Sequence, residues 1–271
     1  MPSSISWSFC MGFFQSNRAF STALVIIVLI ATAVVAEPVP VSPNVAAVEE
    51  ADRLYDATKF TEMYDLLIRF KDTTDDELLW RLARACRYVG LLPSTSKDDK
   101  KRLTFESFDF AQRALEANDQ NSAANKWYAI CLSDTCDYLG TKPKIEHGNV
   151  IKEHLLQAIA LNPEDALSYY WLGLWYYTYA DMAWYERKIA AVVFGSPPSA
   201  TYEEALTMFL AAEMISPNFY SMNQYMIGKT YEKMGDKVSA AVYLKKLLNY
   251  DVKTEEDKEA VKKAEESLKS M

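Results

Sequence analysis

The chain has few of the residues on which most enzyme mechanisms depend. It contains 2 histidines and 8 glycines among 271 residues. Histidine is the most frequent general acid or base near neutral pH, and glycine-rich loops hold phosphate groups, so acid–base and nucleotide-dependent chemistry have little to use here. The sequence also contains no nucleophile elbow, zinc-protease motif or dinucleotide-binding loop. We therefore expect no enzymatic activity, no cofactor and no metal site.

Two short patterns look like parts of functional motifs. The Gly-Lys-Thr run at residues 228–230 resembles the end of a phosphate-binding loop, but the loop requires a glycine where this chain has Asn223. His147 and His154 are separated by one heptad, and no cysteine or carboxylate stands at ligand spacing beside them. We expect Gly228 to be a helix-packing glycine and the two histidines to bind no metal.

Positive charge and paired cysteines are also scarce. The chain has 29 Lys and Arg against 37 Asp and Glu, and its formal net charge of -8 argues against a nucleic-acid partner. Its 4 cysteines lack the spacing of a disulfide framework, and Cys86 and Cys131 fall in helix-core patterns, where we expect packed thiols. No Asn-x-Ser/Thr sequon occurs, which disfavours a lumenal or secreted location.

Apolar residues, in contrast, are abundant and follow a helical period. Half of the chain is hydrophobic and 13% is aromatic. With so few glycines, this composition predicts an all-α domain with a large core. No linker interrupts the helical signal, so we expect one helical domain over residues 45–271. Its last helix, over residues 254–270, is charged on most faces, as the capping helix of a repeat array requires.

Helix-pair signatures recur along this domain. The first-helix signature occurs as Tyr169, Leu172, Gly173 and Tyr176 and again as Ile227, Gly228 and Tyr231. The second-helix signature occurs at equal internal spacing as Ile151, Leu155, Ala158 and Pro163 and as Ala205, Phe209, Ala212 and Pro217. This is the pattern of the tetratricopeptide repeat, a helix–turn–helix unit of about 34 residues. Small residues let the paired helices approach closely, prolines end the second helices, and stacked units form a concave binding surface.

One repeat unit is longer than the others. Pro163 and Pro217 are separated by about 20 residues more than the basic period. The additional segment contains an apolar helical stretch over residues 184–194 and a Gly-Ser-Pro-Pro breaker over residues 195–198. The preceding unit contains a segment over residues 139–144 that we expect to form an extended turn. The sequence thus predicts a tetratricopeptide-like helical-pair solenoid with an inserted helix.

The N-terminal part contains an uncharged apolar run over residues 19–36, after an N-terminal segment over residues 1–18. Its length is at the short limit of a membrane-spanning helix, which needs about 17–25 residues. Residues 37–44 contain three prolines and form a semi-rigid spacer. We expect this run to be a membrane anchor. A cleaved signal peptide is the alternative, because small residues precede Ala33 and Ala36 as at cleavage sites.

The anchor interpretation places the helical domain in the cytoplasm, and cleavage would instead make the protein secreted or lumenal. The charges that flank the apolar run favour the opposite orientation in the membrane. Arg18 precedes the apolar run and Glu37 follows it, so the positive-inside rule favours a cytosolic N-terminus.

Segments of the domain, including parts outside the repeat signature, resemble the regulator of microtubule dynamics family. They lie at residues 77–85, 126–134, 151–163, 184–190, 197–202, 217–220, 228–231 and 254–258. The resemblance covers nearly all of residues 48–271 and includes the inserted segment. It implies a non-enzymatic, microtubule-associated regulator or adaptor, with a membrane anchor in some members. One anchored member is a tether between organelles whose helical domain binds phospholipid, and its receptor-binding motif has no match in this chain.

A strip of basic residues is the first candidate binding site. Arg81, Arg84 and Arg87 repeat every three residues on one helical face, and the next helix adds Lys100, Lys101 and Arg102. Such a strip suits the acidic surface of a microtubule or an anionic lipid. The alternative is a solvated face paired with acidic residues at positions 75–76 and 98–99, because charge runs are weak evidence for a site.

A dense block of aromatic residues over positions 169–185 is the second candidate. It contains more large aromatic side chains than one helix buries on one face. We expect the surplus to line an apolar groove against the inserted helix, suited to an acyl chain or a partner segment. The candidate groove residues are Trp171, Trp175, Tyr179, Trp184 and Tyr185. The alternative is an unusually aromatic core, since aromatic stripes at helical spacing are usually buried.

Overall fold

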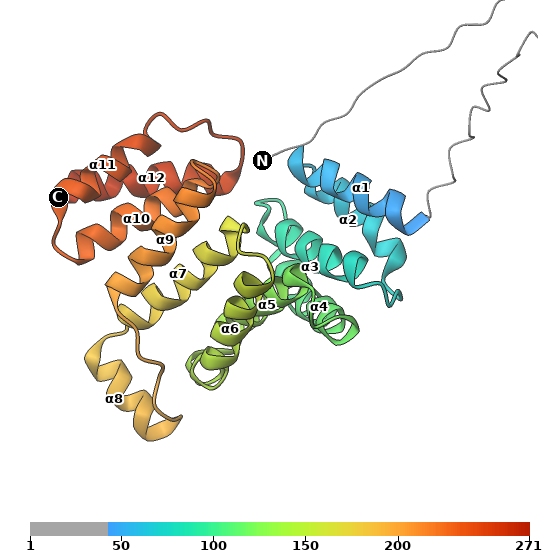
Figure 1. Ribbon diagram of the computed structural model, residues 1–271, viewed down its shortest axis with the longest axis horizontal. Coiled ribbons are helices and arrows are strands. Elements are labelled where there is room, and N and C mark those ends of the chain that lie inside the picture. Colours follow the sequence, from blue (N-terminus) through green and yellow to red (C-terminus); the bar gives the residue numbers. More distant parts are fainter. Residues whose placement is uncertain (1–42) are drawn as a thin grey trace, which may run out of the picture. The chain divides into compact units, whose positions relative to one another are not determined.

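Residues 43–271 are the part of the chain that the computed structural model describes, and helices make up nearly all of its regular structure (Figure 1). In chain order they are α1 (Pro43–Asp56), α2 (Phe60–Leu67), the 3₁₀ turn η1 (Ile68–Phe70), α3 (Asp76–Leu91), α4 (Lys97–Ala117), α5 (Ser122–Leu139), α6 (Thr141–Leu161), α7 (Ala166–Ala180), α8 (Trp184–Val193), α9 (Tyr202–Ile215), α10 (Ser221–Lys233), α11 (Lys237–Leu247) and α12 (Glu255–Ser270). The predicted all-α fold is confirmed.

The helices of this domain pack as successive pairs. The pairs are α1 with α2, α3 with α4, α5 with α6, α7 with α9, and α10 with α11, and α12 packs on the last pair. Two predicted glycines allow this close pairing. A Cβ on Gly173 would lie 2.7 Å from the Phe209 ring, and one on Gly228 would lie 2.7 Å from Leu244. The prediction that these glycines serve helix packing is confirmed.

Local sequence signals set the helix ends. The Asp75 carboxylate accepts the N–H groups of Glu77 and Leu78 at the start of α3, and Thr201 caps α9 in a capping box with Glu204. Such side chains satisfy backbone donors that have no partner within the helix. The helices α6 and α9 both end two residues before a proline, as the repeat signature predicts.

The connection between α5 and α6 differs from the prediction. The extended turn expected over residues 139–144 is wrong, because Gly140 alone separates the two helices. Its φ of 98° is in the left-handed region, where glycine has no steric penalty. Pro143 then lies in the first turn of α6, where its missing N–H leaves no intrahelical hydrogen bond unmade.

The inserted helix exists, as α8, but it packs differently from our expectation. It contacts α6, and Ala190 is its one buried residue. Trp184 is 71% exposed and Val192 is 87% exposed. The apolar side chains of α8 therefore do not complete the core beside α7.

The predicted N-terminal segment, hydrophobic anchor and most of the spacer lie outside the described residues. The helix α1 begins at Pro43, two residues before the expected start of the domain at residue 45. Within residues 43–271, none of the helices is both long enough and apolar enough to cross a membrane.

Candidate functional site

The three candidate arginines of α3 are largely buried, and each has an acidic partner. Arg81 and Arg84 are each 7% exposed, and both donate to the Asp52 carboxylate of α1. Arg81 Nη2 lies 2.6 Å from Asp52 Oδ2, and Arg84 Nη2 lies 2.6 Å from Asp52 Oδ1. Two arginines therefore share one carboxylate, in a contact that joins the first helix pair to the second.

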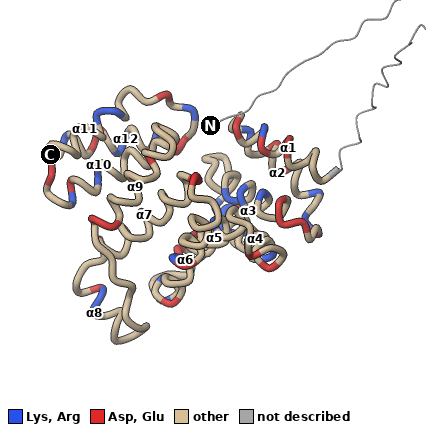
Figure 2. The backbone as a smooth tube through the Cα atoms, viewed as in Figure 1, with Lys and Arg blue, Asp and Glu red and all other residues tan. Residues whose placement is uncertain are grey.

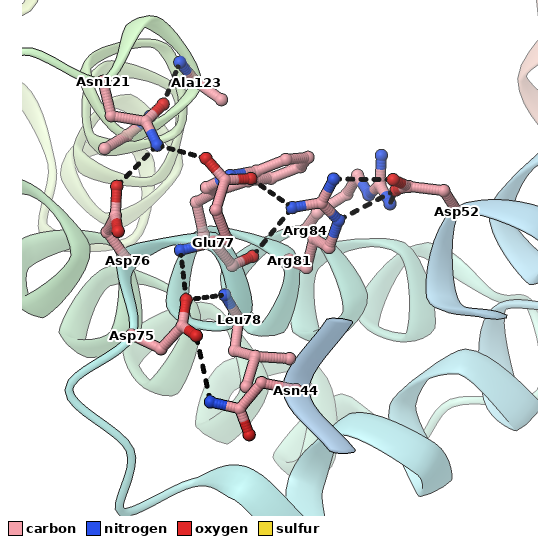
Figure 3. A network of polar contacts seen from close by, with 12 residues as sticks. Asn44, Asp52, Asp75, Asp76, Glu77, Leu78, Arg81, Arg84, Asn121 and Ala123 are labelled. Atoms are coloured by element: carbon pink, nitrogen blue, oxygen red, sulfur yellow. Dashed lines mark hydrogen bonds and ion pairs between the residues drawn. The ribbon is translucent and has the colours of Figure 1, made fainter. Parts of the chain in front are cut away.

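This contact belongs to a polar network at the start of α3 (Figure 3). Arg81 also donates to Glu77, and the other Glu77 oxygen accepts a hydrogen bond of 2.7 Å from Asn121, which caps α5. The network thus crosses from α1 through α3 to α5. The carboxylate partners of Arg81 and Arg84 are Asp52 and Glu77, and not the acidic residues at positions 75–76 and 98–99 that the solvated-face interpretation expected for these arginines.

Electrostatics keeps the Asp52 carboxylate ionised. Burial raises the pKa of Asp52, but the hydrogen bonds from Arg81 and Arg84 together outweigh burial, so its pKa lies below the ordinary value. The guanidinium of Arg84 also lies over the Tyr55 ring, with its carbon 4.0 Å from the ring centroid. Cation–π contact and ion pairing both stabilise this buried charge.

Arg87 lies further along α3 and faces different partners. Its Nε lies 2.7 Å from Asp134 Oδ2 of α5, and its guanidinium carbon lies 5.0 Å from the Trp171 ring centroid. Burial lowers the pKa of Arg87, and the Asp134 carboxylate more than reverses this, so the pKa is raised. Figure 2 shows blue segments on α3, whereas α7 is tan because its sequence contains no charged residue.

The basic candidates of α4 are exposed. Arg102 is paired with Asp99 and with Glu106, so its charge is locally balanced. Lys100 and Lys101 have no ion-pair partner within residues 43–271. These two lysines are therefore the members of the predicted strip whose charge is directed to solvent without compensation.

Three of the five predicted groove residues line one apolar cavity of about 440 Å³. Trp171, Trp175 and Tyr179 form one wall, and the side chains of Ile151 and Leu155 on α6 contribute to the opposite one. Trp175 donates a hydrogen bond of 2.7 Å to the Gly148 carbonyl, and Tyr179 donates one of 2.6 Å to the Lys144 carbonyl. These bonds hold the aromatic side chains of α7 against α6.

The other two predicted groove residues lie elsewhere. Trp184 and Tyr185 start α8 and are exposed, and neither lines this cavity. The helix α8 instead stands across a second, more open cavity of about 900 Å³ from α7. Met182 and Leu174 line both cavities, so the two are neighbours.

Two thiols and one histidine of the described part have structural surroundings. Cys86 and Cys131 are buried, and burial raises the pKa of both thiols, that of Cys131 to about 12. His154 Nδ1 lies 2.9 Å from Asn125 Oδ1, and burial lowers the pKa of its ring. Over residues 43–271 no group of three or more His, Cys, Asp or Glu side chains is arranged to hold a metal ion.

Comparisons with known proteins agree with the resemblance seen in the sequence. The family described as regulator of microtubule dynamics protein 1-3 matches residues 47–271. Regulator of microtubule dynamics protein 1 of Mus musculus is 51% identical over 219 residues, which cover 81% of this chain and 72% of that protein. The chain belongs to the regulator of microtubule dynamics family. Regulator of microtubule dynamics protein 3 of Xenopus laevis is a more distant member, 36% identical over 76% of this chain and 45% of that protein.

A solved structure supports the repeat fold of this family member. A thermophilic tetratricopeptide-repeat protein of Thermus thermophilus matches with a TM-score of 0.56 at 14% sequence identity, covering 82% of this chain and 97% of that one. At such low identity the likeness concerns the fold alone. The predicted tetratricopeptide-like solenoid is confirmed.

The repeat signature of this family member left one important residue unnoticed. Asp52 joins α1 to two buried arginines, yet it lies about thirty residues before them in the chain. Helical periodicity identifies which residues share a face, but it does not identify a partner on another helix. The helix α1 carries four acidic residues, Glu49, Glu50, Asp52 and Asp56, and no local pattern distinguishes Asp52 from the other three.

Proposed function

We propose that this chain is a non-enzymatic regulator of microtubule dynamics that acts in the cytoplasm by binding a protein partner through its helical repeats. The observation that carries the proposal is the family match over residues 47–271, which includes the inserted segment as well as the repeats. Tubulin is the partner that the names of the relatives suggest. Tetratricopeptide arrays are binding surfaces in general, which supports an adaptor role.

Within the predicted basic strip, we assign the contact with tubulin to Lys100 and Lys101 of α4. Arg81, Arg84 and Arg87 already have carboxylate partners inside the domain, so a second acidic surface would have to displace Asp52 or Asp134. The two lysines are exposed and unpaired, so an acidic partner reaches them without breaking any internal contact.

Microtubule co-pelleting of the full chain tests this assignment. The double substitution Lys100→Glu and Lys101→Glu should reduce the co-pelleted fraction and its dependence on salt, because exposed charge pairs are screened by ions. Lys245→Glu with Lys262→Glu is the matched control, since it makes the same change of charge at exposed positions of α11 and α12. Equal loss in both variants would show that net charge alone matters, and no co-pelleting of the unaltered chain would reject tubulin as a direct partner.

The apolar cavities beside α7 favour a second candidate function, the binding or transfer of phospholipid at a membrane contact. Cavities of about 440 Å³ and 900 Å³ that share Met182 and Leu174 are of the size that ligand sites have. Native mass spectrometry of the purified protein should then detect a bound lipid. Met182→Lys should remove it, because the lysine would replace an apolar side chain that lines both cavities with a charged one.

Met214→Lys is the control for this experiment, because Met214 is 82% exposed and lines neither cavity. A lipid-free spectrum of the unaltered protein, together with no uptake of fluorescent phospholipid, would leave the aromatic residues of α7 as core. The function in microtubule regulation does not depend on this outcome.

A further inference from the structure

A third cavity, of about 620 Å³, lies between the first helices of the domain and the last ones. Its walls come from the ends of α1 and α2, from α3, from the start of α10, and from the segment that leads into α12. Six aromatic side chains line it: Tyr55, Phe60, Tyr88, Phe219, Tyr220 and Tyr250. None of the predicted site residues belongs to this cavity, so it is separate from the surfaces of the proposed function.

The aromatic side chains on the α1–α3 side are held in a fixed arrangement. The Phe60 and Tyr88 rings are stacked with centroids 4.6 Å apart, and Tyr55 meets Tyr88 edge-on at 5.3 Å. The hydroxyls of Tyr55 and Tyr88 are hydrogen-bonded at 3.0 Å. All three side chains remain partly exposed, so this preorganised wall is accessible to a ligand.

A carboxylate without an ion pair in the described residues lines the same cavity. Glu256 of α12 accepts a hydrogen bond of 3.2 Å from the Tyr220 hydroxyl, and it forms no ion pair with any of residues 43–271. Burial raises the pKa of Glu256, and the positive charge of Arg87 lowers it by less, so the pKa stays above its ordinary value. Positive charge within the domain therefore only partly compensates this partly buried carboxylate. Arg87 itself is paired with Asp134.

Several other charged residues around the cavity have partners. Lys253 is paired with Asp251, the Asp257 carboxylate accepts the N–H groups of Lys253 and Thr254 at the start of α12, and the Lys246 ammonium lies 4.6 Å from the Tyr243 ring centroid. Asp56, which is exposed at the rim, is a second carboxylate without an ion pair in the described part. The lining carries four carboxylates, Asp56, Asp251, Glu256 and Asp257, against the ammonium groups of Lys246 and Lys253, so its net charge is negative.

We propose that this cavity binds an arginine or lysine side chain presented by a peptide segment of a protein partner. Glu256 accepts the N–H donors of the cation, and the faces of the surrounding aromatic rings stabilise its charge. A basic peptide suits the site better than a quaternary ammonium group, because only the peptide cation donates hydrogen bonds to the carboxylate. The volume also exceeds that of one side chain, which leaves room for neighbouring peptide residues.

Fluorescence anisotropy with the full chain in mild detergent tests the proposal. The probe is a labelled peptide of sequence Gly-Gly-Arg-Gly-Gly with blocked ends, and the comparison peptide carries neutral citrulline in place of arginine. We expect the arginine peptide to bind, binding to weaken as salt rises, and the citrulline peptide to bind at least about tenfold more weakly because it lacks the charge.

Substitutions at α12 locate the site. Glu256→Gln should weaken binding of the arginine peptide about tenfold, and Glu256→Asp should retain part of the affinity because it retains the charge. Glu266→Gln is the matched control, since it makes the same charge change at an exposed position of the same helix that has no ion pair within residues 43–271 and lines no part of this cavity. This control should change the affinity less than about twofold. Unchanged thermal unfolding of each variant shows that the fold is retained.

Three outcomes would overturn the proposal: equal binding of the arginine and citrulline peptides, equal effects of Glu256→Gln and Glu266→Gln, or no binding of the arginine peptide at millimolar concentration. If phosphocholine displaces the labelled peptide more strongly than free arginine does, the cavity binds a quaternary ammonium headgroup instead. Microtubule co-pelleting that persists in any of these cases would leave the proposed function intact.

Discussion

At the residue scale, Asp52 has a structural role that the sequence patterns did not identify, because it pairs with two buried arginines. It is the one carboxylate that Arg84 reaches, and it is shared with Arg81. Removing one member of such a group leaves a buried guanidinium without its anion, which costs more than the pair contributes. The ion pairs between α1 and α3 therefore depend on a single carboxylate.

We predict that Asp52→Asn lowers the free energy of unfolding by about 1–3 kcal/mol. We expect a value in the lower part of this range, because the Asp52 side chain is 40% exposed and water partly replaces the lost carboxylate. Glu49→Gln is the control, because Glu49 lies on the same helix, is exposed and has no ion pair within the described residues. Urea unfolding at pH 7 measures both, and equal midpoints would show that the arginines tolerate the loss.

The same carboxylate sets a pH dependence. Because the pKa of Asp52 is lower in the folded state, its stabilising effect is complete above its unfolded pKa near 4 and is lost as the pH falls through the folded value. The difference in stability between the unaltered protein and Asp52→Asn should therefore shrink between about pH 4 and pH 2. A constant difference over this range would mean that the amide disrupts packing rather than charge.

Two glycine-to-alanine substitutions test whether a glycine is required for close contact between helices. Gly228→Ala should destabilise the protein by about 1–3 kcal/mol, because the new Cβ would lie 2.7 Å from Leu244 in a packed interface. Gly90→Ala should be neutral or stabilise by up to about 1 kcal/mol, since its Cβ would lie 3.7 Å from Leu103 and alanine favours helix. Thermal unfolding of the two variants is the measurement, and an equal loss in both would contradict the close approach.

Residue types and spacing predicted the packing glycines Gly173 and Gly228, since each belongs to a recurring first-helix signature. They did not predict that the arginines of α3 are internal. A three-residue spacing places Arg81, Arg84 and Arg87 on one face, but whether that face meets solvent depends on α1 and α5, which supply Asp52 and Asp134. Long-range packing decided the environment of these charges, and local sequence carries little of that information.

At the element scale, α8 differs from every other helix of the described part. It buries one residue, while the first helix of each repeat pair from α3 onward buries seven or more. Its contacts with the remainder of the domain are few, and they include the hydrogen bonds of Arg187 to the Pro198 and Tyr179 carbonyls. The inserted helix therefore lies on the surface of the solenoid and contributes little to its core.

This attachment leads to a stability prediction. The double substitution Ile189→Gln and Val192→Gln on α8 should change the free energy of unfolding by less than about 0.5 kcal/mol, as exposed positions usually do. Trp175→Ala on α7 should cost about 3–5 kcal/mol, because that side chain is 6% exposed and hydrogen-bonded to Gly148. Chemical unfolding compares the two. A large loss from the α8 variant would show that this helix packs more tightly than its exposure indicates.

The sequence predicted the existence and approximate ends of the helices, because apolar period and caps are local. It predicted less well where a helix without the repeat signature would pack. The connection before α6 was misjudged for a related reason, since a proline usually indicates a turn, but in the first turn of a helix it is tolerated. Three of the aromatic residues predicted for a groove, Trp171, Trp175 and Tyr179, line a cavity together with residues of α6 and not with the inserted helix.

At the scale of the whole molecule, the family match and the repeats account for residues 47–271 and leave the N-terminal apolar run to be explained. Residues 19–36 form an uncharged run whose apolar side chains are expensive to expose to water. Three states avoid this exposure to water: insertion in a bilayer, removal as a signal peptide, or burial against an apolar surface. The location of the helical domain relative to microtubules depends on which of them applies.

We predict insertion, and hence that the full-length protein stays in the membrane fraction after extraction with alkaline carbonate. Deleting residues 19–36 should release it, because the Pro-rich spacer and the charged helical surface provide no comparable apolar segment. Replacing Val28 and Ile30 with lysine is a sharper test, since each charge near the centre of a span opposes insertion by about 2.5–3.5 kcal/mol without shortening the chain. A mature N-terminus at Glu37 would establish cleavage instead. Carbonate-soluble protein that retains residues 19–36 would indicate burial against protein, and protease protection of a C-terminal tag would place the helical domain in a lumen, out of reach of microtubules.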